Sequence, residues 1–126
     1  TLIAVRRLAP EIATSCLTIE AATFNTVRGK DGKPSSWTGG LDIAQHGNSL
    51  PKLVKSAGCA VWSPFWRNLT PALVAEAHAL GLKVLPWTVN QPADIAAMLE
   101  LRVDGLITDY PDRAKALLKE RGIEIE

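Results

Sequence analysis

The chain has 126 residues, of which 47% are hydrophobic and 21% charged, and 14 Lys and Arg against 13 Asp and Glu give a net charge of +1. This is the length of one ordinary domain, and the composition is that of a folded protein rather than a disordered segment. The absence of a basic stripe argues against nucleic acid as a partner, and no apolar run approaches the roughly 18 residues of a membrane span.

The start of the chain indicates whether it is part of a longer protein, and the two cysteines indicate the compartment in which it resides. The first residue is Thr1, and the apolar residues 2–5 precede two arginines, the reverse of the charge-first order of a secretory signal. We therefore expect the sequence to begin partway through a longer protein. Cys16 and Cys59 each lie in an apolar, strand-like run, where we expect a buried free thiol rather than a disulfide or a metal ligand. Free thiols fit a reducing compartment, so the predicted location is cytoplasmic.

The first third of the chain predicts one helix end, one strand and one long loop. Residues 3–8 resemble the end of a helix, and residues 15–20 form an apolar, β-branched run typical of a buried strand. Residues 25–50 contain many glycines and little periodicity, which predicts a loop. A loop of this length in a compact domain is either disordered or functional. Trp37 in its middle favours a flap that packs on the protein.

Helices and strands alternate over the rest of the chain. The predicted elements are helix 51–57, strand 59–62, helix 71–80, strand 82–89, helix 92–101, strand 105–108 and helix 111–121. Ser49 and Thr70 precede helices as N-caps, and Gly58, Gly81 and Gly122 follow helices as C-terminal stops. Proline at position 86 removes a ladder donor, which marks an edge or a bulge in the third strand.

Strands that alternate with single helices predict right-handed βα units and a parallel sheet, so the fold class is α/β. About four such units occupy residues 1–126, with the long loop 25–50 after the first strand. Four units can form an open doubly wound sheet or half of an eight-stranded barrel, which typically needs ~250 residues. Periodicity does not choose between these two architectures.

Four blocks of sequence in fixed order point to a family. They read Trp-Ser-Pro at 62–64, Ala-His-Ala-Leu-Gly-Leu at 77–82, Trp-Thr-Val-Asn at 87–90 and Asp-Gly-Leu-Ile-Thr-Asp-Tyr-Pro at 104–111. Their content and spacing resemble the C-terminal part of the glycerophosphodiester phosphodiesterases. The resemblance implies parallel β/α units that form the C-terminal half of a TIM-type (β/α)8 barrel. It also implies hydrolysis of glycerophosphodiesters to an alcohol and glycerol 3-phosphate with a divalent cation, Mg²⁺ or Ca²⁺.

The catalytic part of the family's pattern has no counterpart in this sequence. The family has an early His-Arg-Gly turn, a Glu-x-Asp strand, a His-Asp pair and a Glu-x-Lys strand, whereas the nearest string here, Val27-Arg28-Gly29, lacks the histidine. Phosphodiester cleavage requires neutralisation of the phosphoryl oxygens and a proton donor. We therefore assign no catalytic and no metal-binding residue to this chain. The cation is expected on a missing N-terminal half, and the chain alone is expected to be inactive.

Four residues remain as candidates for substrate binding. Trp87 matches the family tryptophan that lines the active site, although a tryptophan in this position is also explained by core packing. Trp37 is a candidate contact because its loop follows a strand. Asn90 and Asp109 follow later strands, and either can reach substrate or cap the next helix, at Pro92 or Pro111 respectively.

The two histidines have separate interpretations. His78 lies in a helix beside its apolar stripe, and because barrel helices lie outside the pocket we expect a structural role. His46 lies in the long loop, where a position at the lip of the pocket is the functional alternative.

Two kinds of function follow. In the first, the chain supplies pocket wall to a phosphodiesterase that acts on a small-molecule glycerophosphodiester. In the second, it is a non-catalytic half-barrel that serves as a binding or assembly module. Because a half-barrel leaves strand edges open, we expect the chain to pair with its missing N-terminal half or with itself. Related barrels that cleave phosphoinositides or sphingomyelin fit the Trp-Thr-Val-Asn and Thr-Asp-x-Pro blocks less well.

Overall fold

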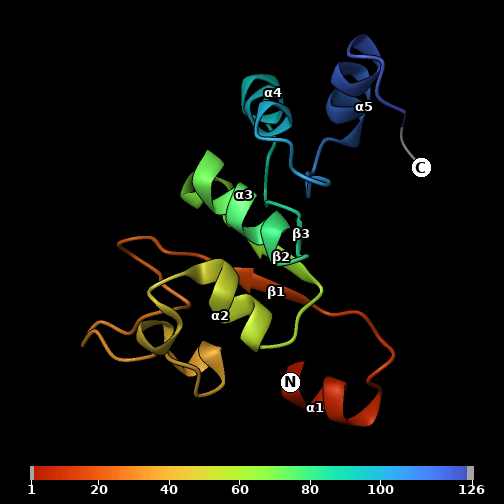
Figure 1. Ribbon diagram of the computed structural model, residues 1–126. Helices are drawn as coiled ribbons and strands as arrows, with labels where there is room; N and C mark the ends of the chain where they lie inside the picture. Colours follow the sequence, from red (N-terminus) through yellow and green to blue (C-terminus); the bar gives the residue numbers. More distant parts are fainter. Residues whose placement is uncertain (1, 125–126) are drawn as a thin grey trace.

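Three short parallel strands run through the middle of the molecule in the order β1-β2-β3 (Figure 1). A computed structural model describes residues 2–124. The strands are β1 (Ser15–Thr18), β2 (Val61–Pro64) and β3 (Lys83–Val84). The helices are α1 (Leu2–Leu8), α2 (Leu50–Ser56), α3 (Pro71–Ala79), α4 (Pro92–Glu100) and α5 (Pro111–Glu120), with 3₁₀ turns η1 (Ser36–Thr38), η2 (Ile43–His46) and η3 (Trp66–Asn68).

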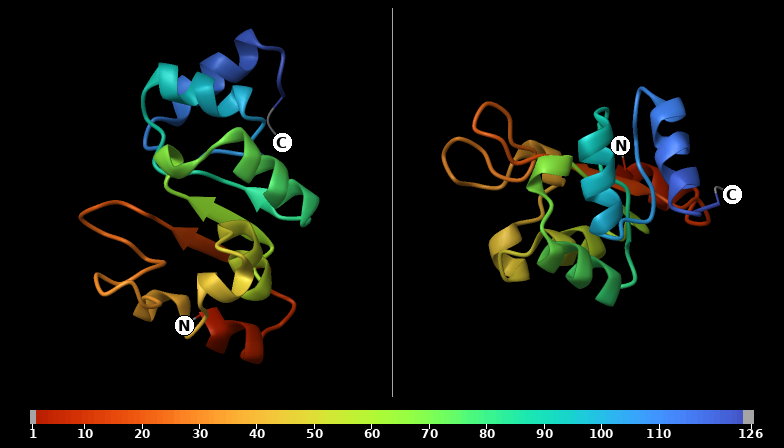
Figure 2. Two further views of the ribbon diagram at one scale, coloured as in Figure 1. Left: turned by 60° about the vertical axis from the view of Figure 1, so that its left-hand side comes forward. Right: turned by 90° about the horizontal axis from the view of Figure 1, so that it is seen from above.

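The predicted alternation of helices and parallel strands is confirmed. In register, Ser15 lies opposite Val61, and Trp62 lies opposite Val84. The views in Figures 1 and 2 place α1 at one end of the molecule and the α4–α5 pair at the other, so the units follow one another in chain order. This arrangement is a curved row of βα units rather than a sheet that reverses its strand order.

The capping signals in the sequence place the helix ends correctly. The Ser49 side chain accepts a hydrogen bond from the amide of Lys52 at the start of α2, and Thr70 does the same for Leu73 at the start of α3. The glycines after α2, α3 and α5 have φ values of 75°, 73° and 67°, as helix termination in the left-handed region requires (Gly58, Gly81, Gly122).

The last two predicted strands are shorter or more irregular than expected. Of residues 82–89, only Lys83 and Val84 form a strand, and residues 105–108 are not a strand in the described structure. The fourth segment nevertheless lies beside the third, because Asp104 N donates to Val84 O at 3.0 Å and Ile107 N donates to Pro86 O at 3.0 Å. Since Pro86 has no amide hydrogen to donate, the ladder is interrupted there.

The long loop is a packed flap, although Trp37, on which that expectation was based, is itself 71% exposed. Within residues 25–50, Val27 is 1% exposed and Ile43 is 4% exposed, and both belong to the core around β2. The centre of that core is Trp62, which is fully buried and donates its Nε1 hydrogen to Thr18 Oγ1 at 2.8 Å. A second core lies between α4 and α5 and includes Val89 and Ile95.

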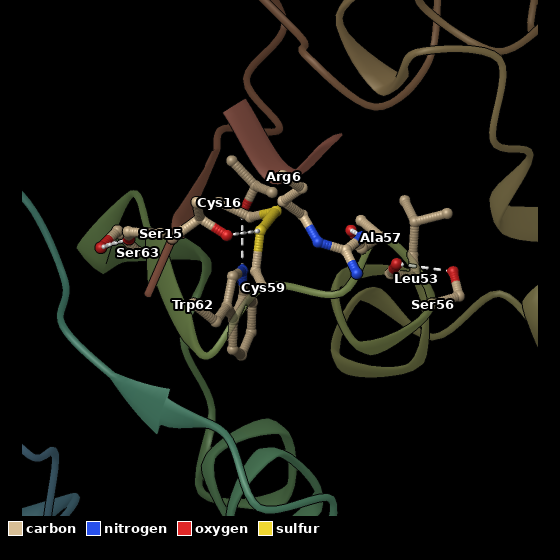
Figure 3. The surroundings of a disulfide bond; sticks show 11 residues. Arg6, Ser15, Cys16, Leu53, Ser56, Ala57, Cys59, Trp62 and Ser63 are labelled. Atoms are coloured by element: carbon tan, nitrogen blue, oxygen red, sulfur yellow. Dashed lines mark hydrogen bonds between the residues drawn. A yellow bond between two sulfur atoms is a disulfide. The ribbon is translucent and has the colours of Figure 1, made fainter. Parts of the chain in front are cut away.

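The prediction that the two cysteines are free is wrong. Cys16 and Cys59 form a disulfide (Figure 3). Cys16 lies in β1 and Cys59 in the segment between α2 and β2, and their Cα atoms are 5.9 Å apart, within the range that a disulfide bridges. The apolar surroundings of each cysteine favour free thiols, whereas the bond depends on how the segment before β2 meets β1.

Among residues 2–124, no helix is both long enough and apolar enough to cross a membrane.

Candidate functional site

Trp37 and Trp87 line the same cavity, whose volume is about 860 Å³. Trp37 comes from η1 in the flap, and 71% of its surface is exposed. Its ring meets that of Phe24 edge to face, with centroids 6.2 Å apart and an interplanar angle of 81°. Phe24, directly before the flap, and Trp37 within it therefore present an aromatic pair to the cavity.

Trp87 is held more firmly than Trp37. Its indole Nε1 donates to Ser63 O at 2.7 Å, and its ring centroid lies 5.8 Å from that of Phe65. Its amide donates to Pro64 O at 3.0 Å, and its carbonyl accepts from Trp66 N at 3.1 Å. Trp87 is half-buried, so one part of the ring packs while another faces the cavity. The core-packing and pocket-wall interpretations thus each describe part of this side chain.

The cavity also follows the outer edge of β1. Five successive residues, 15–19, line it, and successive side chains of a strand point to opposite faces. The cavity therefore lies along the edge that does not pair with β2 rather than over one face of the sheet. Leu17 on this strand is 59% exposed. Among the described lining residues, Arg6 is the only charged one, and its guanidinium donates to Ala57 O (Figure 3).

Asn90 and Asp109 lie together but do not line this cavity within the described structure. Asn90 Nδ2 donates to Asp109 Oδ2 at 2.8 Å. Asn90 Oδ1 accepts from the amide of Asp109 at 3.0 Å and from Thr108 Oγ1 at 3.2 Å. The two loops that follow the third and fourth strand segments are joined through these side chains.

The alternative interpretation of Asn90 and Asp109 as helix caps is wrong. The N-cap of α4 is Gln91 and that of α5 is Tyr110, and neither makes a side-chain capping bond. Each helix has proline near its start, and proline suits the first helical position. The cap is then the residue directly before the proline, one position later than Asn90 or Asp109.

The histidines have structural partners. His78 Nε2 lies 2.8 Å from Asp104 Oδ2, and the same oxygen accepts from the amide of Val84 at 2.8 Å. The structural interpretation of His78 is confirmed, because this contact ties α3 to β3. His46 Nε2 lies 3.2 Å from Ser56 Oγ, a contact between η2 and α2.

No group of three or more His, Cys, Asp or Glu side chains that can hold a metal ion is present among residues 2–124. Catalytic cations such as Mg²⁺ and Ca²⁺ require several converging oxygen ligands. The described residues therefore do not fit a divalent cation.

Two polar residues, in η3 and at the start of α5, make contacts that the sequence does not predict. Asn68 in η3 exchanges two hydrogen bonds with the backbone of Glu20, each 2.9 Å long, so its amide extends the pairing of β1 with β2. Arg113 in α5 donates from Nη1 to the carbonyl oxygen of Asn90 at 2.9 Å. The sequence carries no spacing signal for either contact, since each depends on how distant loops meet.

Comparison with known proteins shows the family. The sequence profile described as "Glycerophosphoryl diester phosphodiesterase family" matches residues 1–113. The chain belongs to this family. A glycerophosphodiester phosphodiesterase of Caldanaerobacter subterraneus subsp. tengcongensis is 39% identical over 59 residues, which are 47% of this chain and 24% of that protein. A probable glycerophosphodiester phosphodiesterase 2 of Mycobacterium tuberculosis is 43% identical over 54 residues, 43% of this chain and 20% of the relative.

Solved structures of the family share the fold. A putative glycerophosphoryl diester phosphodiesterase from Silicibacter pomeroyi has a TM-score of 0.77 at 40% identity, covering 98% of this chain and 36% of its own. An Oleispira antarctica phosphodiesterase, solved in complex with the product sn-glycerol-3-phosphate, has a TM-score of 0.62 at 21% identity over 94% of this chain and 38% of its own. The predicted fold class, parallel β/α units of a TIM-type barrel, is confirmed. The chain spans well under half the length of these family members.

Proposed function

We propose that residues 1–126 are the C-terminal half of the barrel of a metal-dependent glycerophosphodiester phosphodiesterase, with about four βα units and the long loop 25–50. The proposed reaction is hydrolysis of a glycerophosphodiester to an alcohol and glycerol 3-phosphate. The observation that carries the proposal is that Trp37 and Trp87, which lie far apart in the sequence, line one cavity. Family membership and the names of the relatives support the reaction.

In this proposal the chain binds and shields the substrate. Trp37 and Trp87 pack on the glycerol or alcohol moiety, and the energy of this contact comes from removing apolar surface from water. Asn90 and Asp109 are proposed to contact substrate from the neighbouring loops, where the Oδ1 of Asp109 is not committed to the bond with Asn90. No acid–base role is assigned to a residue of this chain.

The proposed divalent cation, Mg²⁺ or Ca²⁺, is held by the N-terminal half rather than by residues 1–126. When bound, such an ion neutralises charge on the phosphoryl oxygens and polarises the phosphorus–oxygen bond. This assignment rests on the family resemblance, in which the cation ligands lie in motifs without a counterpart in this sequence.

The outer edge of β1, which pairs with no other strand among residues 2–124, is proposed as the seat of another strand, from the missing N-terminal half or from a second copy of the chain. In this proposal the added strand fills the part of the cavity along residues 15–18, and substrate occupies the part at Trp87, which pairs with Phe65 beyond the end of β2. An unpaired edge beside an exposed apolar side chain, Leu17, is a template for pairing. Size-exclusion chromatography of residues 1–126 is expected to show self-association or a marginally folded species. A stable, cooperatively unfolding monomer contradicts this part of the proposal.

The activity is tested by measuring glycerol 3-phosphate release from glycerophosphodiesters with the protein as its gene encodes it and with residues 1–126 alone. The encoded protein is expected to require Mg²⁺ or Ca²⁺, and residues 1–126 alone are expected to release none. Release by residues 1–126 alone contradicts the assignment of the catalytic groups to the other half. If the encoded protein is inactive with every glycerophosphodiester and cation tried, the chain is a binding or assembly module instead.

The cytoplasmic location stays a prediction, and the disulfide removes the main reason for it. That argument required free thiols, whereas Cys16 and Cys59 form a disulfide, a bond that persists in oxidising compartments and is rare in the cytosol. Alkylation of thiols in intact cells before lysis distinguishes the two locations. Two modified cysteines support a reducing compartment, and none supports an oxidising one.

A further inference from the structure

Arg113 links the two loops that carry Asn90 and Asp109, and neither the family match nor the sequence motifs assign it a role. It is the third residue of α5 and is half-buried. Its Nη1 donates to the carbonyl oxygen of Asn90 at 2.9 Å. Its Cζ lies 3.9 Å from the centroid of the Tyr110 ring. The guanidinium is therefore held on two sides, by a hydrogen bond in its plane and by an aromatic ring on its face.

The position of Asn90 explains why its carbonyl accepts from a distant side chain. It lies one residue before the N-cap of α4, outside the helix, and Pro92 at the helix start has no amide to offer. The side chain of Asn90 makes its own hydrogen bonds with Thr108 and Asp109. Asn90 is thus hydrogen-bonded through both its backbone carbonyl and its side chain, and the partners all lie in the segment 108–113.

The hydrogen bonds to Asn90 also restrain Trp87, because only two residues separate them and the residue next to Asn90 is held in place. Val89 between them is fully buried, and its amide donates to Ile107 O at 2.9 Å. Trp87 itself is bonded to Pro64 and Trp66 on the opposite side. Hydrogen bonds at both ends therefore restrain the segment 87–90, and the bond from Arg113 to the Asn90 carbonyl is the one at its C-terminal end.

We propose that Arg113 is a positioning residue that fixes the loop 87–91 by holding the Asn90 carbonyl, and thereby sets the place of the Trp87 wall for substrate binding. This rests on the proposed function, because the wall matters only if the cavity binds substrate. A group that positions a binding wall acts on substrate affinity, so its loss raises KM and leaves kcat nearly unchanged.

The test compares Arg113→Met with Arg121→Met in the protein as its gene encodes it. Arg121 is a matched control, since it also joins α5 to α4, through a 2.7 Å contact of Nη1 with Glu100 Oε1, but lies at the far end of the helix. We expect Arg113→Met to raise KM for a glycerophosphodiester about tenfold, the loss of one charge-assisted hydrogen bond, while Arg121→Met leaves KM unchanged. Arg113→Lys keeps the charge and one donor and is expected to recover part of the affinity.

Amide hydrogen exchange supplies a readout that does not depend on activity. Arg113→Met is expected to speed exchange at Val89 and Asp109, whose amides are bonded across the two loops, and Arg121→Met is not. If the wild-type protein hydrolyses no glycerophosphodiester, the proposed function fails, and the exchange experiment still decides whether Arg113 fixes the loop. Equal exchange in both variants, a fall in kcat at constant KM, or equal changes in KM for both variants overturns the inference. If Arg113→Met does not fold, the same measurements on Arg113→Lys decide it.

Discussion

The side chains of Asn90 and Asp109 hydrogen-bond to each other across two loops, with Asn90 Nδ2 donating to Asp109 Oδ2 at 2.8 Å. The amide of Asp109 returns a bond to Asn90 Oδ1 at 3.0 Å. The pair thus makes a closed ring of side-chain and backbone contacts between the ends of the third and fourth strand segments. Because these segments share only an interrupted ladder, the pair replaces part of the pairing that a regular sheet provides.

Reversing this pair tests its energetic role. Asn90→Asp removes the donor and places two carboxylates against each other, so we expect the free energy of unfolding to fall by about 1–3 kcal/mol. In the double variant, Asn90→Asp combined with Asp109→Asn, the amide donor is on residue 109. We expect this variant to recover most of the lost free energy of unfolding. Urea denaturation of the wild type, both single variants and the double variant, each in the protein as its gene encodes it, measures the coupling. Additive single and double effects contradict a direct contact.

This pair also shows what the sequence could predict. The helices were placed well because their ends carry local signals, such as Ser49 before α2 and the glycine after it. Asn90 and Asp109 were found as polar residues at strand ends, since parallel strands bring such residues to one edge. The capping alternative could have been excluded from the sequence, because helices that begin at Pro92 and Pro111 take the preceding residues, Gln91 and Tyr110, as N-caps. The bridge between the two loops could not be predicted, because it depends on how segments distant in the sequence meet.

The disulfide and the flap show the same limit. Cys16 in β1 and Cys59, two residues before β2, meet because folding brings distant segments together, and the sequence of either segment alone does not contain that contact. The flap has no periodicity, yet it buries Val27 and Ile43 in the core. These features depend on contacts between residues far apart in the sequence, whereas helix caps and helical periodicity depend on neighbouring residues.

The contact between His78 and Asp104 supports a second prediction. Asp104 Oδ2 accepts from both His78 and the amide of Val84, and Val84 is fully buried. Asp104→Ala leaves that amide without its side-chain acceptor, so we expect a loss of about 1–3 kcal/mol, compared with about 0.5–1.5 kcal/mol for His78→Ala. Thermal or urea unfolding measures both. Glu76→Ala, which removes a partly exposed 3.8 Å ion pair with Lys52, is the control and is expected to cost under about 1 kcal/mol.

Reduction of the disulfide is the third prediction. The bond closes a loop with a sequence separation of 43, which restricts the unfolded chain. Cys16→Ser combined with Cys59→Ser is therefore expected to lower the free energy of unfolding by about 2–4 kcal/mol. Urea titrations of the wild type with and without a dithiol reductant should reproduce this difference, and the double variant should not respond to the reductant. Two titratable thiols in folded protein purified without reductant would contradict the disulfide.

A substitution at Trp37 tests substrate binding with less effect on stability than a substitution at Trp87. With 71% of Trp37 exposed, Trp37→Ala is expected to change the free energy of unfolding by less than about 0.5 kcal/mol. Trp87→Phe loses the bond to Ser63 O and is expected to cost about 1 kcal/mol.

If the cavity binds the glycerol or alcohol moiety, Trp37→Ala raises KM of the encoded protein about tenfold, the loss of ~1.4 kcal/mol of apolar contact. The matched control is Leu8→Ala, which truncates a side chain that is 78% exposed and lies outside the cavity lining. Steady-state kinetics on both variants measures the difference. Equal KM values would mean that the flap aromatics cover the protein without touching substrate, because truncating an exposed side chain costs affinity only where a ligand had covered it.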